Sequence, residues 1–369
     1  MTAMTRASIP REYGGSANRP RVLWLSPLMR PLARVQAEAL RRRGVDVLLV
    51  TTDQHPESDT ARNYELVLDL RFRTASSWLA AQRRIRQHRP DVVITELVRD
   101  PRWIALAGRA PRIQLVHDER RDGGGRRRGA YARAVFDRWG SRSAATVTYS
   151  NYAAIAVAAR RDVAGTPVTV VPLCSDLDPA LVPPFVGPNE RRDFVVAGRL
   201  GSHKNIDVVL EAWQRHVDGG SWRGDELLLI GTGPLVIHTL PAYVRWRPGS
   251  YCYADVVRTL AAAKGSVAHY RAASQSGVQM LSMQLGVMPI VSPAGGLPEF
   301  QPSVFPPVGV DDVTHLAAAF DELSDPLTAT LRGGAAARHY ADWFAVDHAV
   351  DGLLDVLTEV AGRIGKAPV

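Results

Sequence analysis

Short apolar runs alternate with longer segments of helical periodicity along this chain of 369 residues. In the first half, runs rich in β-branched and aliphatic side chains predict strands at residues 22–25, 45–51, 66–70, 91–95, 113–117, 146–149 and 168–172. Between the first two, residues 31–43 place Leu32, Val35 and Leu40 on one helical face, and Gly44 follows as a stop signal. Strands that alternate with helices predict a parallel sheet covered by helices.

A proline-rich stretch from Asp178 to Pro188 interrupts this alternation and predicts an interdomain linker. The alternation then resumes, with strands expected at 194–197, 227–230, 244–246, 267–269 and 289–291. Because this length suits two domains, we expect an α/β fold in which two Rossmann-like domains face each other across a cleft. The expected parts are a tail at 1–19, a first domain at 20–180, the linker at 181–190, a second domain at 191–340 and a C-terminal helix at 341–369.

The composition, 46% hydrophobic and 22% charged, is that of a soluble globular protein. No apolar stretch approaches the roughly 18 residues of a membrane span, and the first residues lack the apolar core of a signal peptide, so we expect a cytoplasmic protein. The two cysteines, Cys174 and Cys252, have no His or Cys cluster around them, so no metal site is expected there.

The formal net charge of +8 raises the question of an anionic partner. Arginines gather at positions 41–43, 83–84, 120–121 and 126–128, but no nucleic-acid recognition motif accompanies them. We therefore expect no nucleic-acid partner. Solvated surfaces are the first interpretation of these clusters, and peripheral attraction to an anionic inner membrane face is the second.

The strongest local motif surrounds two cations that follow the strand at 194–197. Gly198 provides a turn, and Arg199 and Lys204 stand five residues apart before a helix that begins near Asn205. A departing diphosphate needs positive charge, which arginine supplies as a planar fork and lysine as a point charge. Asn205 is expected to cap the helix and add its N-terminus to the anion site. The alternative is an ordinary surface pair of cations in a βα loop.

Two glycine turns follow further along the second domain. The first is Ile-Gly-Thr-Gly-Pro at 230–234, and the second is Gly-Gly-Leu-Pro-Glu at 295–299. With Gly-Arg-Leu at 198–200 and Lys204, they occur in the order that is typical of glycosyltransferase family 4. The chain resembles this family, whose members are retaining enzymes of the GT-B fold, over residues 194–300.

The resemblance implies transfer of a sugar from a nucleotide-diphosphate sugar to an acceptor hydroxyl, with retention of anomeric configuration and with no metal or other cofactor. The acceptor would be a glycan, a lipid-linked glycan or a small molecule, as in polysaccharide or glycosylated-metabolite biosynthesis. The donor would bind the second domain and the acceptor the first, and the C-terminal helix would cross back to the first domain.

The chain departs from the family at its paired-Glu motif. Leu281 stands where the second Glu, which holds the donor ribose, is expected, and Ala273 or Ser274 stands where the first is expected. A family branch instead uses Ser-Gln-Ser-Gly, as found at 274–277, and these side chains could bind phosphate ahead of a helix starting near Val278. The missing pair leaves a second hypothesis open, a catalytically inactive relative that acts as partner or regulator of an active transferase.

The donor contacts implied by the resemblance are Gly198, Gly231, Gly233, Ser274, Gln275, Ser276, Gly277, Gly295, Gly296 and Glu299. In the first domain, His117 and Asp118 end a strand where the family commonly shows this pair, with the imidazole facing the donor sugar. Residues 26–31 carry two prolines in place of the family's Gly-Gly turn, and proline lacks an amide donor, so we expect Arg30 or Arg34 to contact phosphate or acceptor there. The expected catalytic residues are therefore Arg199, Lys204 and His117, with Asp118, Arg30 and Arg34 on the acceptor side.

Overall fold

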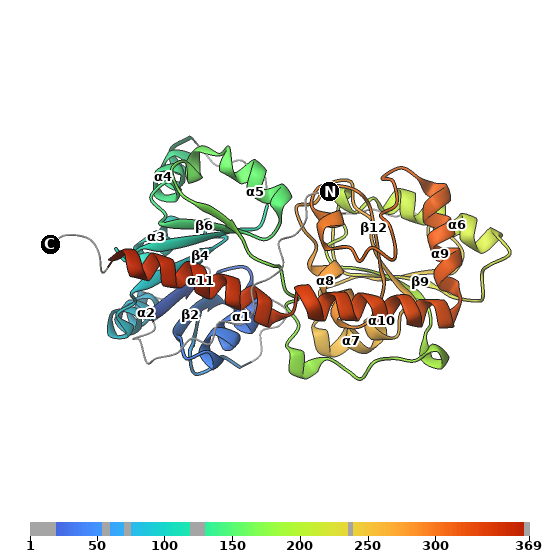
Figure 1. Cartoon of the computed structure of the whole chain (residues 1–369), viewed down its shortest axis with the longest axis horizontal. Helices are drawn as coiled ribbons and strands as arrows, with labels where there is room; N and C mark the ends of the chain where they lie inside the picture. The colour runs from blue at the N-terminus through green and yellow to red at the C-terminus, as the bar shows by residue number, and fades with distance from the viewer. Residues whose placement is uncertain (1–19, 54–59, 70–74, 119–129, 235–238, 365–369) are drawn as a thin grey trace.

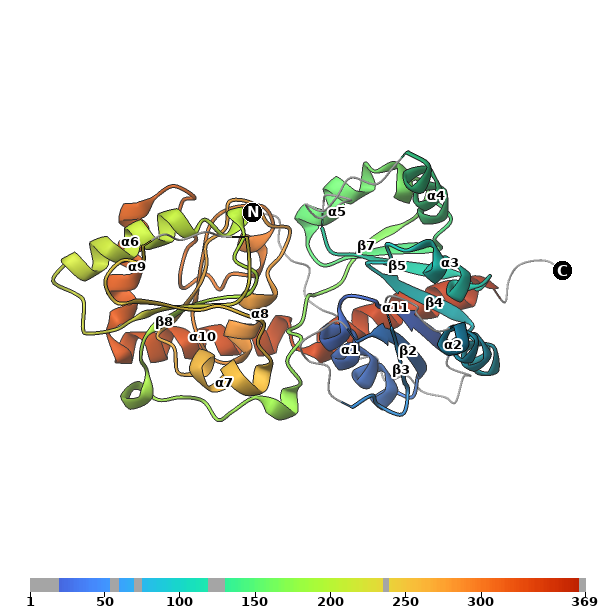
Figure 2. The same ribbon diagram turned by 180° about the vertical axis from the view of Figure 1, so that it is seen from behind.

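The computed structural model describes residues 20–53, 60–69, 75–118, 130–234 and 239–364, which form two α/β domains side by side (Figures 1 and 2). The expected tail at 1–19 and the arginines at 120–121 and 126–128 lie outside these residues. Within the described part of the chain, no helix is both long and apolar enough to cross a membrane.

The first domain is built on a parallel sheet of seven strands in the order β3-β2-β1-β4-β5-β6-β7. Both faces of the sheet are buried, which explains the continuous apolar runs in the sequence. Val22 and Trp24 of β1 face one core cluster, whereas Leu23 and Leu25 face the other. The strands are β1 (Arg21–Leu25), β2 (Asp46–Thr52), β3 (Glu65–Leu68), β4 (Val92–Glu96), β5 (Arg112–Val116), β6 (Ala145–Thr148) and β7 (Val168–Val170).

The helices of the first domain cover both faces of this sheet. Ile85 and Trp103, from the second and third helices, pack with Leu23, and Leu40 from the first helix packs with Val22. The helices are α1 (Arg30–Arg42), α2 (Ala75–His88), α3 (Pro101–Ala107), α4 (Ala130–Gly140) and α5 (Asn151–Ala158).

The second domain repeats this plan with a parallel sheet in the order β10-β9-β8-β11-β12. Its strands are β8 (Phe194–Ala197), β9 (Leu227–Ile230), β10 (Val244–Arg247), β11 (Gly265–Ala268) and β12 (Pro289–Val291). Its helices are α6 (Ile206–Asp218), α7 (Tyr253–Ala261), α8 (Gly277–Gln284), α9 (Val313–Ser324) and α10 (Pro326–Trp343). Every strand expected from the apolar runs is present, with ends shifted by at most two residues.

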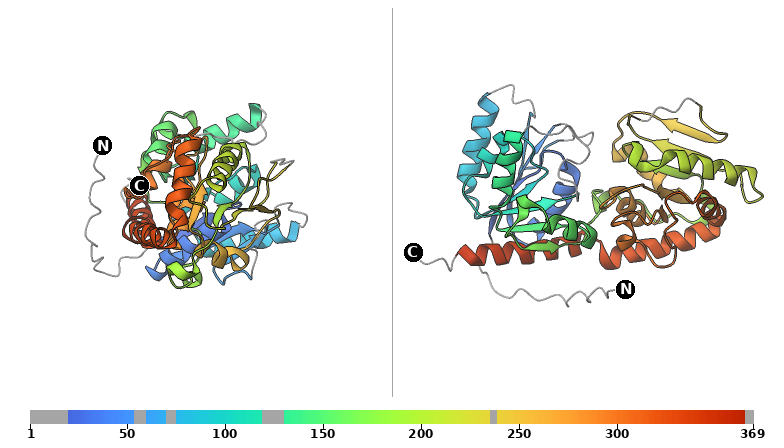
Figure 3. Two further views of the ribbon diagram at one scale, coloured as in Figure 1. Left: turned by 90° about the vertical axis from the view of Figure 1, so that its right-hand side faces the viewer. Right: turned by 90° about the horizontal axis from the view of Figure 1, so that it is seen from above.

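The last helix, α11 (Val346–Ile364), follows α10 along one side of the molecule and lies against the first domain (Figure 3). It packs on α1, where Arg43 Nε lies 2.7 Å from a carboxylate oxygen of Asp351. Val350 and Leu354 of α11 belong to the apolar cluster that holds Val22. The arginines at 41–43 therefore include one that attaches the C-terminal helix to the first domain.

Each sheet has a point at which the strand order reverses, between β1 and β4 in the first domain and between β8 and β11 in the second. Ligands of open α/β sheets bind outside the carboxyl ends of the strands at such points. Loops of the two domains meet across the interface, since the Ser150 hydroxyl after β6 donates to the Ser274 carbonyl oxygen after β11 at 3.0 Å. The functional site is therefore expected between the two domains.

Candidate active site

A cavity of about 570 Å³ lies between the domains at the carboxyl ends of the second-domain strands. Its lining brings together the two predicted cations and three of the four residues of the Ser-Gln-Ser-Gly segment. The lining residues are Met29 of the first domain, Asp176, Gly198, Arg199, His203, Lys204, Thr232, Gly249, Ser250, Tyr251, Tyr253, Tyr270, Gln275, Ser276, Gly277, Val278 and Leu281.

Arg199 is exposed on the wall of this cavity and makes no hydrogen bond or ion pair with the residues that the structure describes. The loop that carries it is shaped by glycine. Gly198 has a φ of +98°, and a Cβ at Gly231 would lie 2.0 Å from the Gly198 carbonyl oxygen. The two loops after β8 and β9 can approach this closely only because position 231 has no side chain.

Lys204 is buried, with 5% of its surface exposed, yet it borders the same cavity. Its Nζ donates to the Ala197 carbonyl oxygen at 2.7 Å and to the Tyr270 hydroxyl at 2.9 Å. No carboxylate of the described residues pairs with it. A buried ammonium that lacks a counter-ion is costly, and an anionic ligand in the cavity would lower that cost. An ammonium has three N–H donors, so one is left for that ligand.

Asn205 does not cap the following helix as expected. Its backbone is left-handed, with a φ of +53°, and its side chain caps no helical amide. Instead the side-chain amide donates to the Val310 carbonyl oxygen at 2.6 Å and to Nδ1 of His269 at 3.2 Å. The residue therefore ties the loop after β8 to the neighbouring strand, and α6 contributes no capped N-terminus to the anion site.

The Ser-Gln-Ser-Gly segment leads into α8. The Ser276 hydroxyl accepts a hydrogen bond from the backbone N–H of Gln279 and lies 3.2 Å from the Tyr270 hydroxyl, which in turn contacts Lys204. Ser276 is thus a helix cap and also part of the polar wall that carries the lysine. Ser274 does not line the cavity but meets the first domain through its carbonyl oxygen.

The imidazole of His117 lies between a carboxylate and this segment. Its Nε2 lies 2.6 Å from Glu96 Oε1, and Gln275 Nε2 lies 2.9 Å from its Nδ1. The other Glu96 oxygen accepts from the Ser26 hydroxyl at 2.6 Å, and the Glu96 side chain is completely buried. Because an ionised carboxylate only accepts, His117 donates through Nε2, and Nδ1 then accepts from the Gln275 amide. This assigns the tautomer of His117 from its partners.

Close to Lys204, the ring of His203 completes the polar wall of the cavity. Burial lowers the pKa of His203 below its ordinary value, and the positive charges of Lys204 and Arg199 lower it further, whereas Asp118 acts in the opposite direction. The charges of Lys204 and Arg199 thus add to the effect of burial at this end of the cavity, and the first-domain carboxylate of Asp118 opposes them.

Arg30 and Arg34, which were expected on the acceptor side, both form ion pairs with Glu65. Arg30 Nε lies 2.7 Å and Arg34 Nη2 lies 2.6 Å from the Glu65 carboxylate, which is fully buried. Burial alone would raise the pKa of Glu65, but hydrogen bonds from Arg34, Arg30, the Arg62 amide and Thr51 outweigh it and lower the pKa to about 2. This cluster holds α1 against β3.

The remaining predicted donor contacts lie beside the cavity. Glu299 accepts from the backbone N–H groups of Asn151 and Tyr152 at 2.7 Å each, and so it holds the first turn of α5 from across the interface. A Cβ at Gly296 would lie 2.2 Å from the Ser274 carbonyl oxygen. The structure places four predicted glycines behind the cavity loops, where they permit close backbone contacts: Gly231, Gly233, Gly295 and Gly296.

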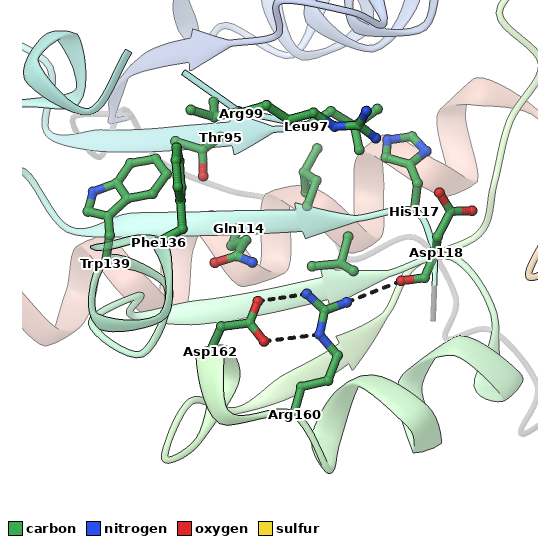
Figure 4. A pocket seen from close by; sticks show the side chains of 13 residues that line it. Thr95, Leu97, Arg99, Gln114, His117, Asp118, Phe136, Trp139, Arg160 and Asp162 are labelled. Atoms are coloured by element: carbon green, nitrogen blue, oxygen red, sulfur yellow. Dashed lines mark hydrogen bonds and ion pairs between the residues drawn. The ribbon is translucent and has the colours of Figure 1, made fainter. Parts of the chain in front are cut away.

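A second, smaller hollow of about 80 Å³ lies in the first domain beside His117 (Figure 4). His117 and Asp118 stand at one end, and the rings of Phe136 and Trp139 form the other. Below Asp118, Arg160 donates to its carbonyl oxygen at 3.2 Å. The hollow therefore combines charged groups near the domain interface with an apolar inner wall.

Several cavity residues escaped the sequence-based predictions, among them Asp176, His203, Tyr253 and Tyr270. His203 and Tyr270 stand beside motifs that were recognised, in the cation loop and just after β11, so their position after a strand was a usable signal. Asp176 follows β7, before the predicted linker, and Tyr253 opens α7. Nothing in the local pattern around either residue distinguishes it from a loop or helix residue.

Residues 32–179, which lie in the first domain, match the family described as Glycosyltransferase Family 4. This part of the chain is similar to glycosyltransferase family 4. No curated protein matches the chain in sequence. The family match lies in the first domain, whereas the motifs of the cation pair and the glycine turns lie in the second.

Solved structures resemble this chain over nearly its whole length. A glycosyltransferase from Rickettsia africae ESF-5 has a TM-score of 0.64 at 14% identity, covering 93% of this chain and 99% of its own. Sucrose-phosphate synthase from Thermosynechococcus elongatus has a TM-score of 0.64 at 14% identity, with 94% and 100% covered. Anabaena HepE in complex with UDP-glucose has a TM-score of 0.62 at 12% identity, with 92% and 100% covered. At these identities the likeness establishes the fold, which is GT-B.

Proposed function

We propose that this chain transfers a sugar from a nucleotide-diphosphate sugar to an acceptor hydroxyl with retention of anomeric configuration. The observation that carries the proposal is the position of Arg199 and Lys204 together on one cavity between two Rossmann-like domains. Lys204 is a buried cation with no carboxylate partner among the described residues, which suits a site that receives an anion. HepE, a structural neighbour, is described as a complex with UDP-glucose.

In the proposed reaction, the bond between the sugar's anomeric carbon and the diphosphate oxygen breaks, and negative charge grows on the departing diphosphate. Arg199 and Lys204 stabilise that charge. The acceptor hydroxyl oxygen attacks from the face that the diphosphate leaves, which retains the configuration, and its proton passes to the departing diphosphate oxygen. The two cations take the role that a divalent metal has in other transferases, so we propose that no metal is required.

His117 is proposed to contact a donor sugar hydroxyl through Nδ1. The Glu96 contact fixes the proton on Nε2, so that Nδ1 carries the lone pair. Without donor, Nδ1 is satisfied by Gln275 of the opposite domain. A sugar hydroxyl would replace the amide at this position, and the acceptor would approach from the first-domain hollow beside Asp118.

The test is a donor screen that uses mass spectrometry. The purified protein is incubated with UDP-, GDP-, ADP- and dTDP-sugars in the presence of EDTA, and released nucleoside diphosphate is measured as slow hydrolysis. At least one donor is expected to be hydrolysed, with the Arg199→Ala variant slower by ten-fold or more. If no donor binds or is hydrolysed, the proposal is wrong; if turnover occurs only when Mg²⁺ or Mn²⁺ replaces EDTA, metal independence is wrong.

The alternative is a catalytically inactive relative that acts as partner or regulator of an active transferase. Leu281 favours this alternative, because an apolar side chain borders the cavity where family 4 enzymes carry a carboxylate. A donor that binds with no turnover, in the wild type and in Arg199→Ala alike, would support the inactive relative.

We also propose that the protein acts at an anionic cytoplasmic membrane face. The support is α2 and the residue after it, where Arg83, Arg84, Arg86 and Arg89 are exposed and Leu79 has 62% of its surface exposed. Basic side chains around an exposed apolar residue suit an anionic lipid surface. Sedimentation with phosphatidylglycerol vesicles, but not with phosphatidylcholine vesicles, is expected.

A further inference from the structure

Asp176 is the one carboxylic acid among the described residues that line the cavity. It stands in the segment after β7, so neither sheet carries it, and its side chain is half-buried. Burial raises the pKa of Asp176, and the hydrogen bond from Tyr253 opposes that effect. A carboxyl group of this kind needs hydrogen-bond donors around it.

Tyr253 supplies one such donor, since its hydroxyl donates to Oδ1 of Asp176. The tyrosine is the first residue of α7, and its ring packs in the apolar cluster that contains Leu177 and Leu281. Gln284 of α8 also donates to the Leu177 carbonyl oxygen at 3.3 Å. Two second-domain helices therefore hold the segment that carries Asp176, so the carboxyl group has a fixed place on the cavity wall.

The charged groups on the cavity wall favour different parts of a ligand. A diphosphate is attracted by Arg199 and Lys204 and repelled by an ionised Asp176. A carboxylate that borders such a cavity can instead accept hydrogen bonds from hydroxyl groups, and two neighbouring hydroxyls match its two oxygens. Leu281, which borders the same cavity, offers no polar atom for them.

We propose that Asp176, held in place by Tyr253, binds hydroxyl groups of the bound nucleotide sugar, in the form of a vicinal diol. This inference rests on the proposed function. The ribose carries such a diol, and so does the transferred sugar. The two sources are distinguished by ligands that lack one or the other.

The experiment is isothermal titration of the wild type, Asp176→Asn and Tyr253→Phe with whichever of UDP, GDP and ADP binds the wild type most tightly. The same titrations use its 2′-deoxy form and the matching nucleotide sugar. Asp178→Asn is the matched control, because Asp178 lies outside this cavity and caps Ala180, a role that asparagine also fills. Thermal melting verifies that each variant is folded.

About ten-fold weaker binding is expected for Asp176→Asn, a smaller loss for Tyr253→Phe and no change for Asp178→Asn. If the ribose is the source, the 2′-deoxy form binds the wild type about ten-fold more weakly, and Asp176→Asn no longer distinguishes the two nucleotides. If the donor sugar is the source, Asp176→Asn loses affinity for the nucleotide sugar but not for the free diphosphate.

Equal affinity of the wild type and Asp176→Asn for all three ligands overturns the inference and leaves the proposed function intact. A wild type that binds no nucleotide at all contradicts both.

Discussion

Gln275 of the second domain donates a hydrogen bond to Nδ1 of His117 in the first, with 2.9 Å between the nitrogens. The contact joins the loop before α8 to the end of β5, so it spans the domain interface. On the other side of the ring, Glu96 accepts a hydrogen bond from Nε2–H. The His117 ring is therefore in contact with both domains. Its Nδ1 lone pair faces the site proposed for the donor sugar.

The Glu96 carboxylate positions His117, and Glu96→Gln should weaken that function. A charge-assisted hydrogen bond becomes a neutral one, worth about 1 to 2 kcal/mol less, so a fall in kcat of roughly ten-fold is expected, with a smaller change in KM. Nitrogen-15 NMR of the His117 ring should show a mixture of tautomers in the variant and the Nε2–H form in the wild type. Unchanged kcat and ring shifts would contradict the positioning role.

Arg199 and Lys204 should each contribute to donor binding. Arg199→Ala and Lys204→Met are expected to cost about 2 kcal/mol or more each, measured as donor affinity and kcat/KM. Methionine keeps the length and apolar stem of the buried lysine without its charge. Arg192→Ala is the control, since Arg192 is an exposed arginine just before β8. Equal losses in all three variants would mean that general charge, and not this pair, matters.

Donor binding should be linked to proton uptake at His203. Burial and the cations of Lys204 and Arg199 lower its pKa, so in the free protein the ring is less protonated than that of an ordinary histidine. A bound diphosphate cancels part of the positive potential and raises the pKa again, so uptake of a fraction of a proton is expected on the acid side of neutrality. Calorimetric titration of a nucleotide sugar, in buffers of different ionisation enthalpy, measures this proton uptake. The His203→Gln variant should show no uptake, and equal uptake in both proteins would count against the assignment.

The Glu65 cluster should make stability depend on acid pH. Its pKa is about 2 in the fold and 4.5 ordinarily, so the ionised form stabilises the fold above pH 4.5, and this contribution is lost as the pH falls from 4.5 towards 2. Glu65→Gln is expected to lower the free energy of unfolding by about 3 kcal/mol at pH 7, because Arg30 and Arg34 lose their shared carboxylate, and by less at pH 3. Urea unfolding at both pH values measures this, with exposed Glu190→Gln as control. A pH-independent difference would be inconsistent with this account.

The strands and the two-domain plan could be predicted because burial on both faces of a parallel sheet leaves continuous apolar runs in the sequence. The cation pair was recognisable because Gly198, Arg199 and Lys204 stand close together in the chain. The ion pairs of Arg30 and Arg34 with Glu65 were not predicted, because Glu65 is distant in sequence and reaches them only once β3 has joined the sheet. Local pattern carries no information on such pairing.

The role of Asn205 was predicted wrongly for a different reason. Asparagine before an apolar helix is a typical cap, but the residue also tolerates left-handed backbone, and here it takes that conformation and bonds to the far side of the loop. The hydrogen bonds of Glu299 and Asp176 depend on how the second domain lies against the first domain and against the linker. Their partners are therefore set by tertiary structure alone.

The most direct test of the central claim is a crystal structure of the protein with the nucleoside diphosphate that binds most tightly. We predict that phosphate oxygens lie within about 3.2 Å of Lys204 Nζ and of the Arg199 guanidinium. A nucleotide bound at any other place, with these two side chains arranged as they are without it, would contradict the account.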